Sequence, residues 1–350
     1  MRYLFILLIT FGIVSCNEMP KKSRQISIVE IKTLLEDSTL NVRAIEIDGE
    51  GFGFATSNGE IGSADYSVVK DEEIASISMQ LKHDSIVPNF RSMALTQKGG
   101  FLLSIASPTL LYKVTKDSLK LVYKEENEKA FYDSIDFWND NEGIAIGDPT
   151  DECMSIIITR DAGKTWKKLS CSVLPKAIKG EAAFAASDTN IAIVGDETWV
   201  ATGGMASRIL YSPDKGETWE VFETPIIQGK QTTGIYSLDF YDVNNGFAIG
   251  GDYTKPNDSL NNKIRTSDGG KTWQIVGNVK SPGYRSCVQY IPGSNAKELV
   301  SVGFKGIDYS SDAGENWKHL SDEGFYTIRF LNDSIAYAAG KGRISKLSFR

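Results

Sequence analysis

The stretch Thr266-Ser267-Asp268-Gly269-Gly270-Lys271-Thr272-Trp273 has three further copies in this chain of 350 residues. They occupy residues 159–166, 212–219 and, in a looser form, 310–317. A sequence that recurs in this way indicates repeated structural units. In each copy the Asp can accept hydrogen bonds from the backbone of a tight turn, and the Gly suits a positive φ. We therefore predict four hairpin turns, in which Asp161, Asp214, Asp268 and Asp312 have a structural and not a catalytic role.

The spacing of these turns predicts the fold. The four aspartates are 53, 54 and 44 residues apart, and short apolar runs separated by Gly, Asn, Asp and Pro fill the intervals. Units of about 40–50 residues with four strands each are typical of β-propeller blades. We predict an all-β protein: a seven-bladed β-propeller of four-stranded antiparallel blades. A six-bladed ring, with residues 42–80 as an irregular lead-in, is the alternative.

The last blade has three evident strands, at 327–330, 335–339 and 344–349. We expect the N-terminal segment 26–31 to supply its fourth strand. This closure would join the two ends of the chain and remove an open sheet edge. Residues 26–350 are then a single propeller domain.

The first residues have a different character. Arg2 precedes an apolar run of about eleven residues, which is too short to span a bilayer and is typical of a signal peptide. Ile13-Val14-Ser15-Cys16 resembles the lipobox of bacterial lipoproteins, in which the signal (here 1–15) is removed and the Cys is lipidated. Asn17 follows, and the resemblance then implies anchoring in the outer membrane, on its periplasmic side or at the cell surface. Residues 16–25 form the lipidated Cys and a polar tether. An ordinary secretory signal is the alternative.

The composition excludes several functions. The net charge of −7, without a basic block, argues against nucleic acid as a partner. The sequence contains no CxxC motif and only two histidines, so we expect no metal site. It also lacks G-x-S-x-G, HExxH, P-loop and dinucleotide-binding motifs, so we expect no cofactor. In an exported chain we predict a disulfide between Cys153 and Cys171, because they lie almost symmetrically about the turn at 159–166.

A candidate site emerges when the innermost strands of the units are aligned. The residue before the small Ser, Ala or Thr that opens each inner strand is polar or aromatic in all seven units: Arg43, Arg91, Asp133, Glu181, Tyr236, Arg285 and Tyr326. We expect these side chains to surround one mouth of the central channel. The loops between the second and third strands open on that face and carry Asp148, Asp196, Trp199, Asp252 and Tyr253. We predict that this face binds a ligand, and the alternative is a set of merely solvated or mutually paired side chains.

The aspartate turns resemble the BNR or Asp-box repeats of sialidase-like propellers. Together with Gly246-Phe247-Ala248-Ile249-Gly250, the pattern resembles the photosystem II stability/assembly factor family of seven-bladed propellers. The resemblance covers residues 130–320 clearly and 40–130 weakly. It implies a non-catalytic propeller that binds protein partners, and Arg43, Arg91 and Arg285 match the inner-face arginines of that family by position.

A sialidase-like glycoside hydrolase is the alternative function. Sialidases hold the sugar carboxylate with three arginines and use Tyr with Glu as nucleophile and Asp as acid. In this chain Asp133, Glu181 and Tyr326 would take the catalytic roles, although no Arg-Ile-Pro motif is present. We expect instead a lipid-anchored propeller without catalytic activity. Its partners are the membrane, through Cys16, and a protein or a carbohydrate or other anionic ligand.

Overall fold

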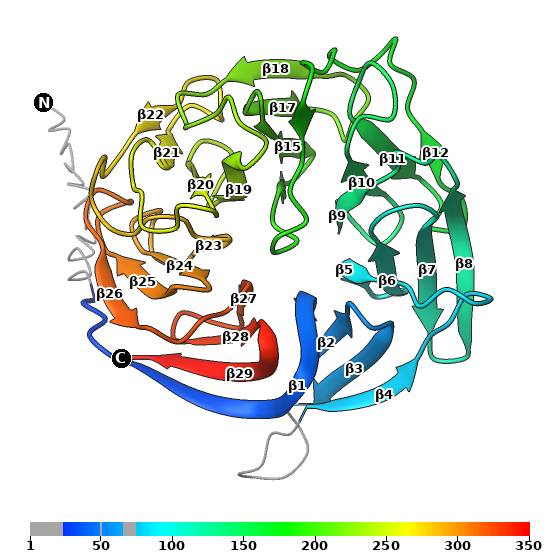
Figure 1. Cartoon of the computed structure of the whole chain (residues 1–350), viewed down its shortest axis with the longest axis horizontal. Helices are drawn as coiled ribbons and strands as arrows, with labels where there is room; N and C mark the ends of the chain where they lie inside the picture. Colours follow the sequence, from blue (N-terminus) through cyan, green and yellow to red (C-terminus); the bar gives the residue numbers. More distant parts are fainter. Residues whose placement is uncertain (1–23, 50, 66–74) are drawn as a thin grey trace, which may run out of the picture.

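The computed structural model describes residues 24–49, 51–65 and 75–350, and these form a closed ring of β-sheets (Figure 1). In this part of the chain every regular element is a strand. It contains no helix that is long and apolar enough to cross a membrane. The prediction of an all-β propeller is confirmed. The pairings divide into seven four-stranded antiparallel blades.

The blades follow one another in chain order. Blade 1 contains the second part of β1 (Val29–Ile47), β2 (Gly51–Thr56), β3 (Glu60–Asp65) and β4 (Ser76–Gln80). Blade 2 contains β5 (Phe90–Thr96), β6 (Gly99–Ser104), β7 (Thr109–Thr115) and β8 (Ser118–Glu125). Blade 3 contains β9 (Tyr132–Phe137), β10 (Gly143–Gly147), β11 (Ser155–Thr159) and β12 (Lys167–Lys168). Blade 4 contains β14 (Ile191–Val194), β15 (Glu197–Ala201), β17 (Arg208–Ser212) and β18 (Glu220–Glu223).

The remaining blades have the same plan. Blade 5 contains β19 (Thr233–Phe240), β20 (Gly246–Asp252), β21 (Lys263–Thr266) and β22 (Gln274–Ile275). Blade 6 contains β23 (Cys287–Tyr290), β24 (Leu299–Gly303), β25 (Gly306–Ser310) and β26 (Lys318–Ser321). Blade 7 contains β27 (Thr327–Phe330), β28 (Ile335–Ala339), β29 (Lys341–Phe349) and the first part of β1. Two short strands, β13 (Glu181–Ala182) and β16 (Gly203–Gly204), extend the sheet of blade 5.

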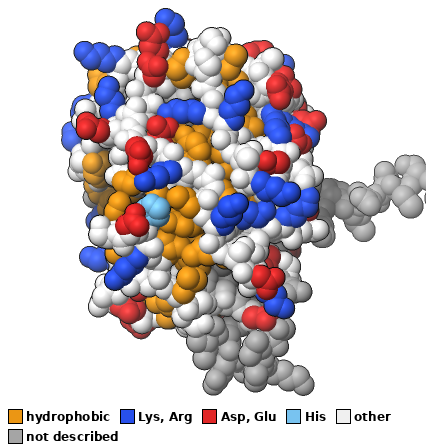
Figure 2. Space-filling model, turned by 90° about the vertical axis from the view of Figure 1, so that its right-hand side faces the viewer, with side chains coloured by type: hydrophobic (Ala, Val, Ile, Leu, Met, Phe, Trp, Pro, Cys, Tyr) orange, Lys and Arg blue, Asp and Glu red, His pale blue; other side chains and the backbone are white. Residues whose placement is uncertain are grey.

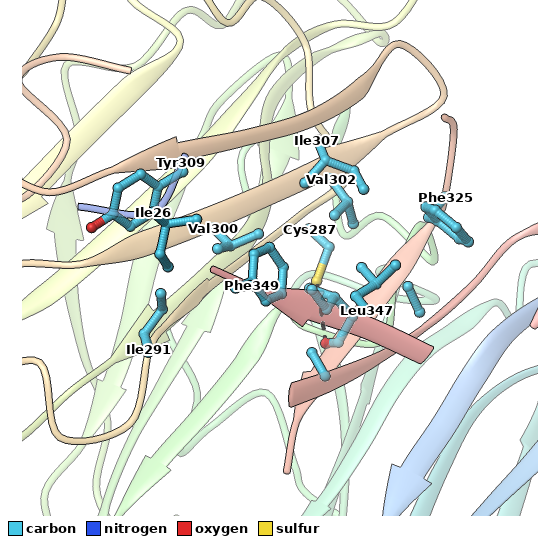
Figure 3. Packing of buried hydrophobic residues seen from close by; sticks show 13 residues of the cluster. Ile26, Cys287, Ile291, Val300, Val302, Ile307, Tyr309, Phe325, Leu347 and Phe349 are labelled. Carbon is cyan, nitrogen blue, oxygen red and sulfur yellow. Dashed lines mark hydrogen bonds between the residues drawn. The ribbon is translucent and has the colours of Figure 1, made fainter. Parts of the chain in front are cut away.

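The long strand β1 closes the ring. Its first part pairs with β29, from Val29 opposite Phe349, and its second part pairs with β2, ending with Ile47 opposite Phe52. One strand is therefore the outermost strand of blade 7 and the innermost strand of blade 1. Ile26, just before β1, is buried among apolar side chains of blades 6 and 7 (Figure 3). The packing of the ring thus includes both ends of the described chain.

The four repeated turns share one set of hydrogen bonds. In the second repeat of the motif, Asp214 Oδ1 accepts from the backbone N–H of Thr218 at 2.8 Å, and its Oδ2 accepts from the Thr218 hydroxyl at 2.6 Å. Asp161 and Asp268 accept from Thr165 and Thr272 in the same way, and Asp312 accepts from the backbone N–H and the side-chain amide of Asn316. The turn Gly packs against the preceding blade: a Cβ on Gly163 would lie 2.1 Å from the Phe101 ring. These turns therefore fasten neighbouring blades.

The ring has two distinct faces. The aspartate turns lie beside the turns between the first and second strands of a blade, as Ala162 N–H donates to Asn141 O and Gly269 N–H to Asn244 O. We call this side the box face. The loops between the second and third strands open on the other side, the pocket face. The described chain enters at the box face, where Arg24 contacts Glu298 and Asp333.

Blade 4 departs from the sequence-based alignment. We predicted that Glu181 and Ala182 open its innermost strand, and this was wrong: that strand is β14, which begins ten residues later. The intervening residues 183–190 leave the sheets and cross the central channel, as the green segment that reaches into the middle of the ring in Figure 1 shows. We call residues 183–190 the plug.

Cys153 and Cys171 form a disulfide with a Cα–Cα distance of 5.4 Å. It joins the loop after β10 to the loop after β12, on the pocket face of blade 3. An isolated bridge between Cys153 and Lys176 continues this contact. Cys287 is a free, buried thiol. The disulfide therefore stabilises the loop that leads into the plug.

Candidate functional site

A cavity of about 670 Å³ opens on the pocket face, at the mouth of the central channel. Ligand pockets in proteins have volumes of about 300–1,000 Å³. Two arginines lie on the side of blades 1 and 2, aromatic side chains lie on the side of blades 5 and 6, and residues 180–186 form much of the lining between them. The cavity therefore has a cationic half and an aromatic half.

Arg43 and Arg91 form the cationic half. The Arg43 guanidinium lies 3.9 Å above the Tyr326 ring, and it donates a hydrogen bond to Asn41. Arg91 Nη1 donates to the carbonyl oxygen of Ala185 at 3.2 Å. Among the described residues neither guanidinium forms an ion pair, and both Nε groups are buried without a hydrogen-bond partner. These two cations are therefore available to an anion.

The electrostatics of this half favour a negative ligand. Burial and, to a smaller extent, the neighbouring Arg43 charge lower the pKa of Arg91 to about 10. Both groups still carry a positive charge at neutral pH. Two like charges at one mouth repel each other, and a bound carboxylate or phosphate would relieve that repulsion while accepting several N–H bonds.

The aromatic half is a continuous cluster. Phe184 of the plug stacks on Tyr236, with ring centroids 4.0 Å apart and an angle of 9°. Tyr284 lies edge-on to Tyr236 at 4.8 Å and contacts Phe304 at 5.5 Å. Tyr253 completes the cluster, 6.4 Å from both tyrosines. Such offset and edge-to-face arrangements are favourable for aromatic side chains.

The plug forms the floor between these halves. The hydroxyl of Ser92 and the backbone N–H of Met93 both donate to the buried Asp188 carboxyl, and Ser134 donates to Asn190. On the opposite side Thr327 Oγ1 donates to Ser187 O at 2.8 Å. Strands of blades 2, 3 and 7 thus hold the segment, and the central channel is closed below the pocket.

Three predicted site residues are enclosed by the protein itself. The Glu181 carboxylate accepts from Arg208 at 2.6 and 3.0 Å, and Arg285 is paired with Asp308 at 2.6 Å. Asp133 is fully buried behind Arg91; burial, followed by the nearby Asp148 charge, holds its pKa well above the usual range. Our expectation that Arg285 belongs to the arginine cluster was wrong, because its charge is used within blade 6. The suggested catalytic set of Asp133, Glu181 and Tyr326 does not converge on the cavity, since only Tyr326 offers its side chain there.

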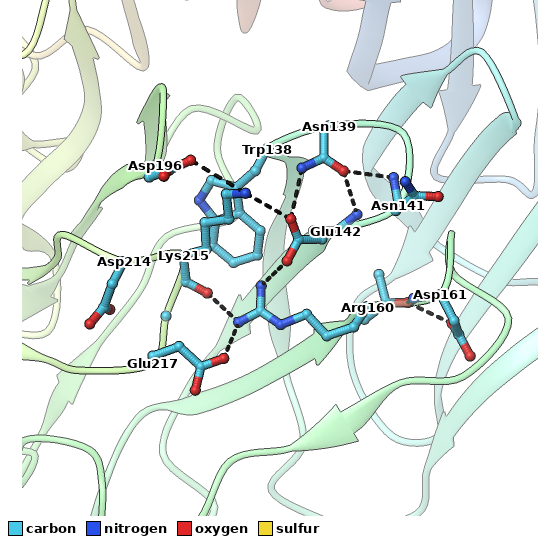
Figure 4. A network of polar contacts seen from close by, with 12 residues as sticks. Trp138, Asn139, Asn141, Glu142, Arg160, Asp161, Asp196, Asp214, Lys215 and Glu217 are labelled. Atoms are coloured by element: carbon cyan, nitrogen blue, oxygen red, sulfur yellow. Dashed lines mark hydrogen bonds and ion pairs between the residues drawn. The ribbon is translucent and has the colours of Figure 1, made fainter.

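Two further predictions placed residues on the wrong face. Trp199 is completely buried, stacks on Phe240 at 3.8 Å and donates to Gly269 O of an aspartate turn at 2.8 Å. Asp196 lies in the turn between β14 and β15 on the box face, where it contacts Lys215 at 3.3 Å (Figure 4). Both errors follow from the misassigned inner strand of blade 4. We predicted that the turn at residues 195–196 joins the second and third strands, whereas it joins the first and second strands.

The Asp196 region is a network between blades 3 and 4. Arg160 lies between Glu142 and Glu217, with a distance of 3.0 Å to each, and Lys215 contacts Glu142 at 2.8 Å (Figure 4). These charges are satisfied by one another. On the rim of the ring Figure 2 likewise shows basic and acidic side chains interspersed with hydrophobic ones. Neither region has the excess of one charge that the pocket arginines present.

The remaining predicted residues lie on the pocket face. Asp148 lines the cavity and accepts from Ala183 N–H at 2.8 Å, and burial raises its pKa to about 6. Tyr236, Tyr253 and Tyr326 also line the cavity. Asp252 accepts from the backbone and the hydroxyl of Thr254 and so shapes the loop that carries Tyr253.

Sequence reasoning missed four aromatic residues that line the cavity: Phe131, Phe184, Tyr284 and Phe304. Phe184 belongs to the plug, whose sequence has neither a strand-like alternation nor a copy in the other units. Tyr284 comes one position before the residue that the alignment selected. Phe304 occupies the short turn between β24 and β25, and an aromatic side chain between two glycines of a hairpin was the available signal.

Comparison with solved structures identifies the same architecture in other proteins. A structure described as "YCF48 bound to D1 peptide" matches with a TM-score of 0.65 and 15% identity, over 93% of this chain and 98% of that chain. YCF48 from Cyanidioschyzon merolae matches with a TM-score of 0.61 and 11% identity, over 91% of this chain and 98% of that one. The WD40 propeller domain of Doa1 matches with a TM-score of 0.58 and 12% identity, over 93% and 96% of the two chains. These similarities show the propeller fold. No protein-family model and no curated protein sequence matches the chain.

Proposed function

We propose that the protein is a non-catalytic binding propeller that captures a partner protein through a carboxylate seated between Arg43 and Arg91. The observation that carries the proposal is the pair of half-buried guanidiniums without an ion-pair partner among the described residues, in a cavity of about 670 Å³. Groups of this kind bind planar anions with directed N–H bonds.

Two further observations support a protein partner. The pocket lies among loops at a channel mouth, where propellers present variable side chains on a rigid ring. A protein with the same fold has been solved with a peptide bound, as its description states. Glu181, one of the carboxylates that a sialidase-like hydrolase would need, is paired with Arg208. This pairing favours a binding function over hydrolysis.

The test is a pull-down from detergent-solubilised membranes of the native host with the wild-type protein, the double variant Arg43→Ala/Arg91→Ala, and Arg350→Ala. Arg350 is an exposed arginine that pairs with Glu30 at 2.8 Å, far from the pocket, and it serves as the matched control. Loss of hydrogen bonds to a charged group costs about 1.5–3 kcal/mol each. We expect the double variant to lose the captured protein, with a Tm within about 2 °C of the wild type, and Arg350→Ala to retain it. An unchanged set of captured proteins in the double variant contradicts the proposal.

We further propose that Cys16 is lipidated and anchors the protein to the outer membrane, because residues 13–16 resemble a lipobox. Residues 1–23 lie outside the described part of the structure. In detergent phase partition we expect the wild-type protein in the detergent phase and Cys16→Ser in the aqueous phase. Recovery of both proteins in the aqueous phase would refute the anchor.

A further inference from the structure

Two aromatic side chains of the pocket are unusually exposed to solvent. Tyr253 is 48% exposed and Phe304 is 43% exposed, although both rings belong to a cluster whose other members are largely buried. Large aromatic side chains that merely stabilise a fold are highly buried on average. Here two rings line the cavity, while Tyr236 contacts Tyr253, and Tyr284 contacts both Tyr253 and Phe304.

The backbone holds these two rings in place. Phe304 lies in a two-residue turn between Gly303 and Gly306, which pair with each other, and Gly306 has a φ of +121°. Tyr253 follows the end of β20. The carboxylate of Asp252 accepts hydrogen bonds from the backbone N–H and the hydroxyl of Thr254, at 3.0 and 2.6 Å, and so fixes the backbone on both sides of Tyr253. The rings come from two different blades and line the same cavity. Rigid aromatic side chains of this kind bind apolar groups at a small loss of conformational entropy.

The two halves are close enough to act on one ligand. Both halves line the same cavity, and Tyr284 lines it too while contacting Tyr236 and Phe304. Burial, only partly offset by the charge of Arg43, keeps the pKa of Tyr284 above its ordinary value, so that its hydroxyl remains neutral. A ligand seated at the arginines therefore has an apolar surface next to it.

We infer that Tyr253 and Phe304 form a subsite for an aromatic side chain adjacent to the carboxylate held by Arg43 and Arg91. The inference rests on the proposed function and specifies its ligand: a peptide segment that combines one carboxylate with one aromatic residue. The carboxylate comes either from the C-terminus of the peptide or from an acidic side chain next to the aromatic residue.

Four unlabelled, N-acetylated peptides test this by isothermal titration calorimetry with the full-length protein. The first ends in Gly-Ser-Gly-Phe with a free carboxylate, the second is its amide, and the third ends in Gly-Ser-Gly-Ala with a free carboxylate. The fourth has Gly-Phe-Glu-Gly followed by an amide, so that its only carboxylate is a side chain. Tyr253→Ala/Phe304→Ala is compared with Leu260→Ala, an exposed apolar residue on the same loop as Tyr253 that does not line the cavity.

We expect the Phe carboxylate, or the Phe-Glu peptide if the side chain supplies the anion, to bind about ten-fold more tightly than the Ala carboxylate. The double aromatic variant should reduce this ratio to near one, with the weak affinity for the Ala peptide unchanged, whereas Leu260→Ala should preserve it. Equal binding of the Phe and Ala peptides, a ratio that survives in the double aromatic variant, or no binding of either Phe peptide overturns the inference. Failure of the proposed function has a different signature, in which Arg43→Ala/Arg91→Ala binds every peptide as tightly as the wild type.

Discussion

At the scale of single residues, the pKa of an aspartate is lowered in an aspartate turn of the box face and raised at Asp133 near the pocket. Burial alone would raise the pKa of Asp268, but hydrogen bonds from Thr272 and Thr266 outweigh it and lower the pKa. For Asp133 burial is the largest effect, the backbone N–H of Ala185 and the charge of Arg91 offset it only in part, and the pKa is raised. The local sequence explains the difference, because Asp268 has hydroxyl residues two positions before and four positions after it. Asp268 is therefore charged and structural, whereas Asp133 is neutral.

The charged turn can be tested at Asp268. We expect Asp268→Ala to lower the free energy of unfolding by about 1–3 kcal/mol, because the N–H and hydroxyl of Thr272 lose their charged acceptor. Chemical denaturation measures this change. Asp117→Ala is the control, since Asp117 is exposed in the equivalent turn of blade 2, which lacks the motif, and it should change stability by less than about 0.5 kcal/mol. Equal losses in the two variants would contradict a fastening role.

At the scale of elements, the plug is the segment where the structure differs from the repeat pattern of the sequence. The inner strands of the other blades begin with a small residue that follows a polar or aromatic one, and Glu181-Ala182 has the same form. In the structure this dipeptide pairs with β16, and the true inner strand follows the plug. Short-range pattern could not reveal the insertion, because its stability comes from long-range contacts such as Ser92 with Asp188 and Thr327 with Ser187.

Asp188 tests whether these contacts hold the plug. Burial, only partly offset by Arg329, keeps the pKa of Asp188 well above its usual range, so the side chain is neutral and an amide of the same shape can replace it. We expect Asp188→Ala to lose about 2–4 kcal/mol of stability, because Ser92 and the Met93 N–H are left without their buried partner. Asp188→Asn should lose less than half of that amount in the same denaturation assay. Similar losses for both variants would show that the carboxyl is needed for its charge and would refute this account.

At the scale of the whole molecule, much of the fold could be predicted and less of the site. The spacing of the aspartate turns predicted the all-β propeller, and the strands at 327–330 and 335–339 were predicted with the bounds that the structure has. Arg43, Arg91 and Tyr326 lie together in one cavity, since a repeated backbone places equivalent residues around one mouth. Trp199 and Asp196 do not, because a single misassigned strand reverses which turns face the pocket. Phe184 could not be inferred at all, since its position depends on an insertion that has no counterpart in the other blades.

The closed channel should also give the ring an unusual pH dependence. At the mouth opposite the pocket, Asp136 and Asp239 lie near Glu46 and Arg329, and burial raises the pKa of each aspartate to about 7. Between about pH 4 and 7 the unfolded chain has lost these protons while the native state keeps them. The free energy of unfolding should therefore fall as pH rises through this window, by up to about 1.4 kcal/mol per pH unit and group.

Asp136→Asn/Asp239→Asn removes both titrating groups while each amide oxygen can still accept the backbone N–H of Phe137 or Tyr290. We expect the double variant to show a flatter dependence of unfolding free energy on pH, measured by denaturation at pH 4, 5, 6 and 7. The box aspartates, whose pKa values are lowered, lose their contribution only below about pH 4, so they do not obscure this window. Identical slopes for the wild type and the double variant would contradict the assignment.

The face on which the N-terminal segment joins the ring determines which partners the pocket can contact. Arg24 lies on the box face, whereas the arginine pocket opens on the other face. With the lipid proposed at Cys16, residues 17–23 hold the ring within about 25 Å of the bilayer even at full extension. The membrane then lies toward the box face, and the pocket opens away from the membrane. A captured segment must therefore belong to a soluble protein or to a part of a membrane protein that extends beyond the thickness of the propeller.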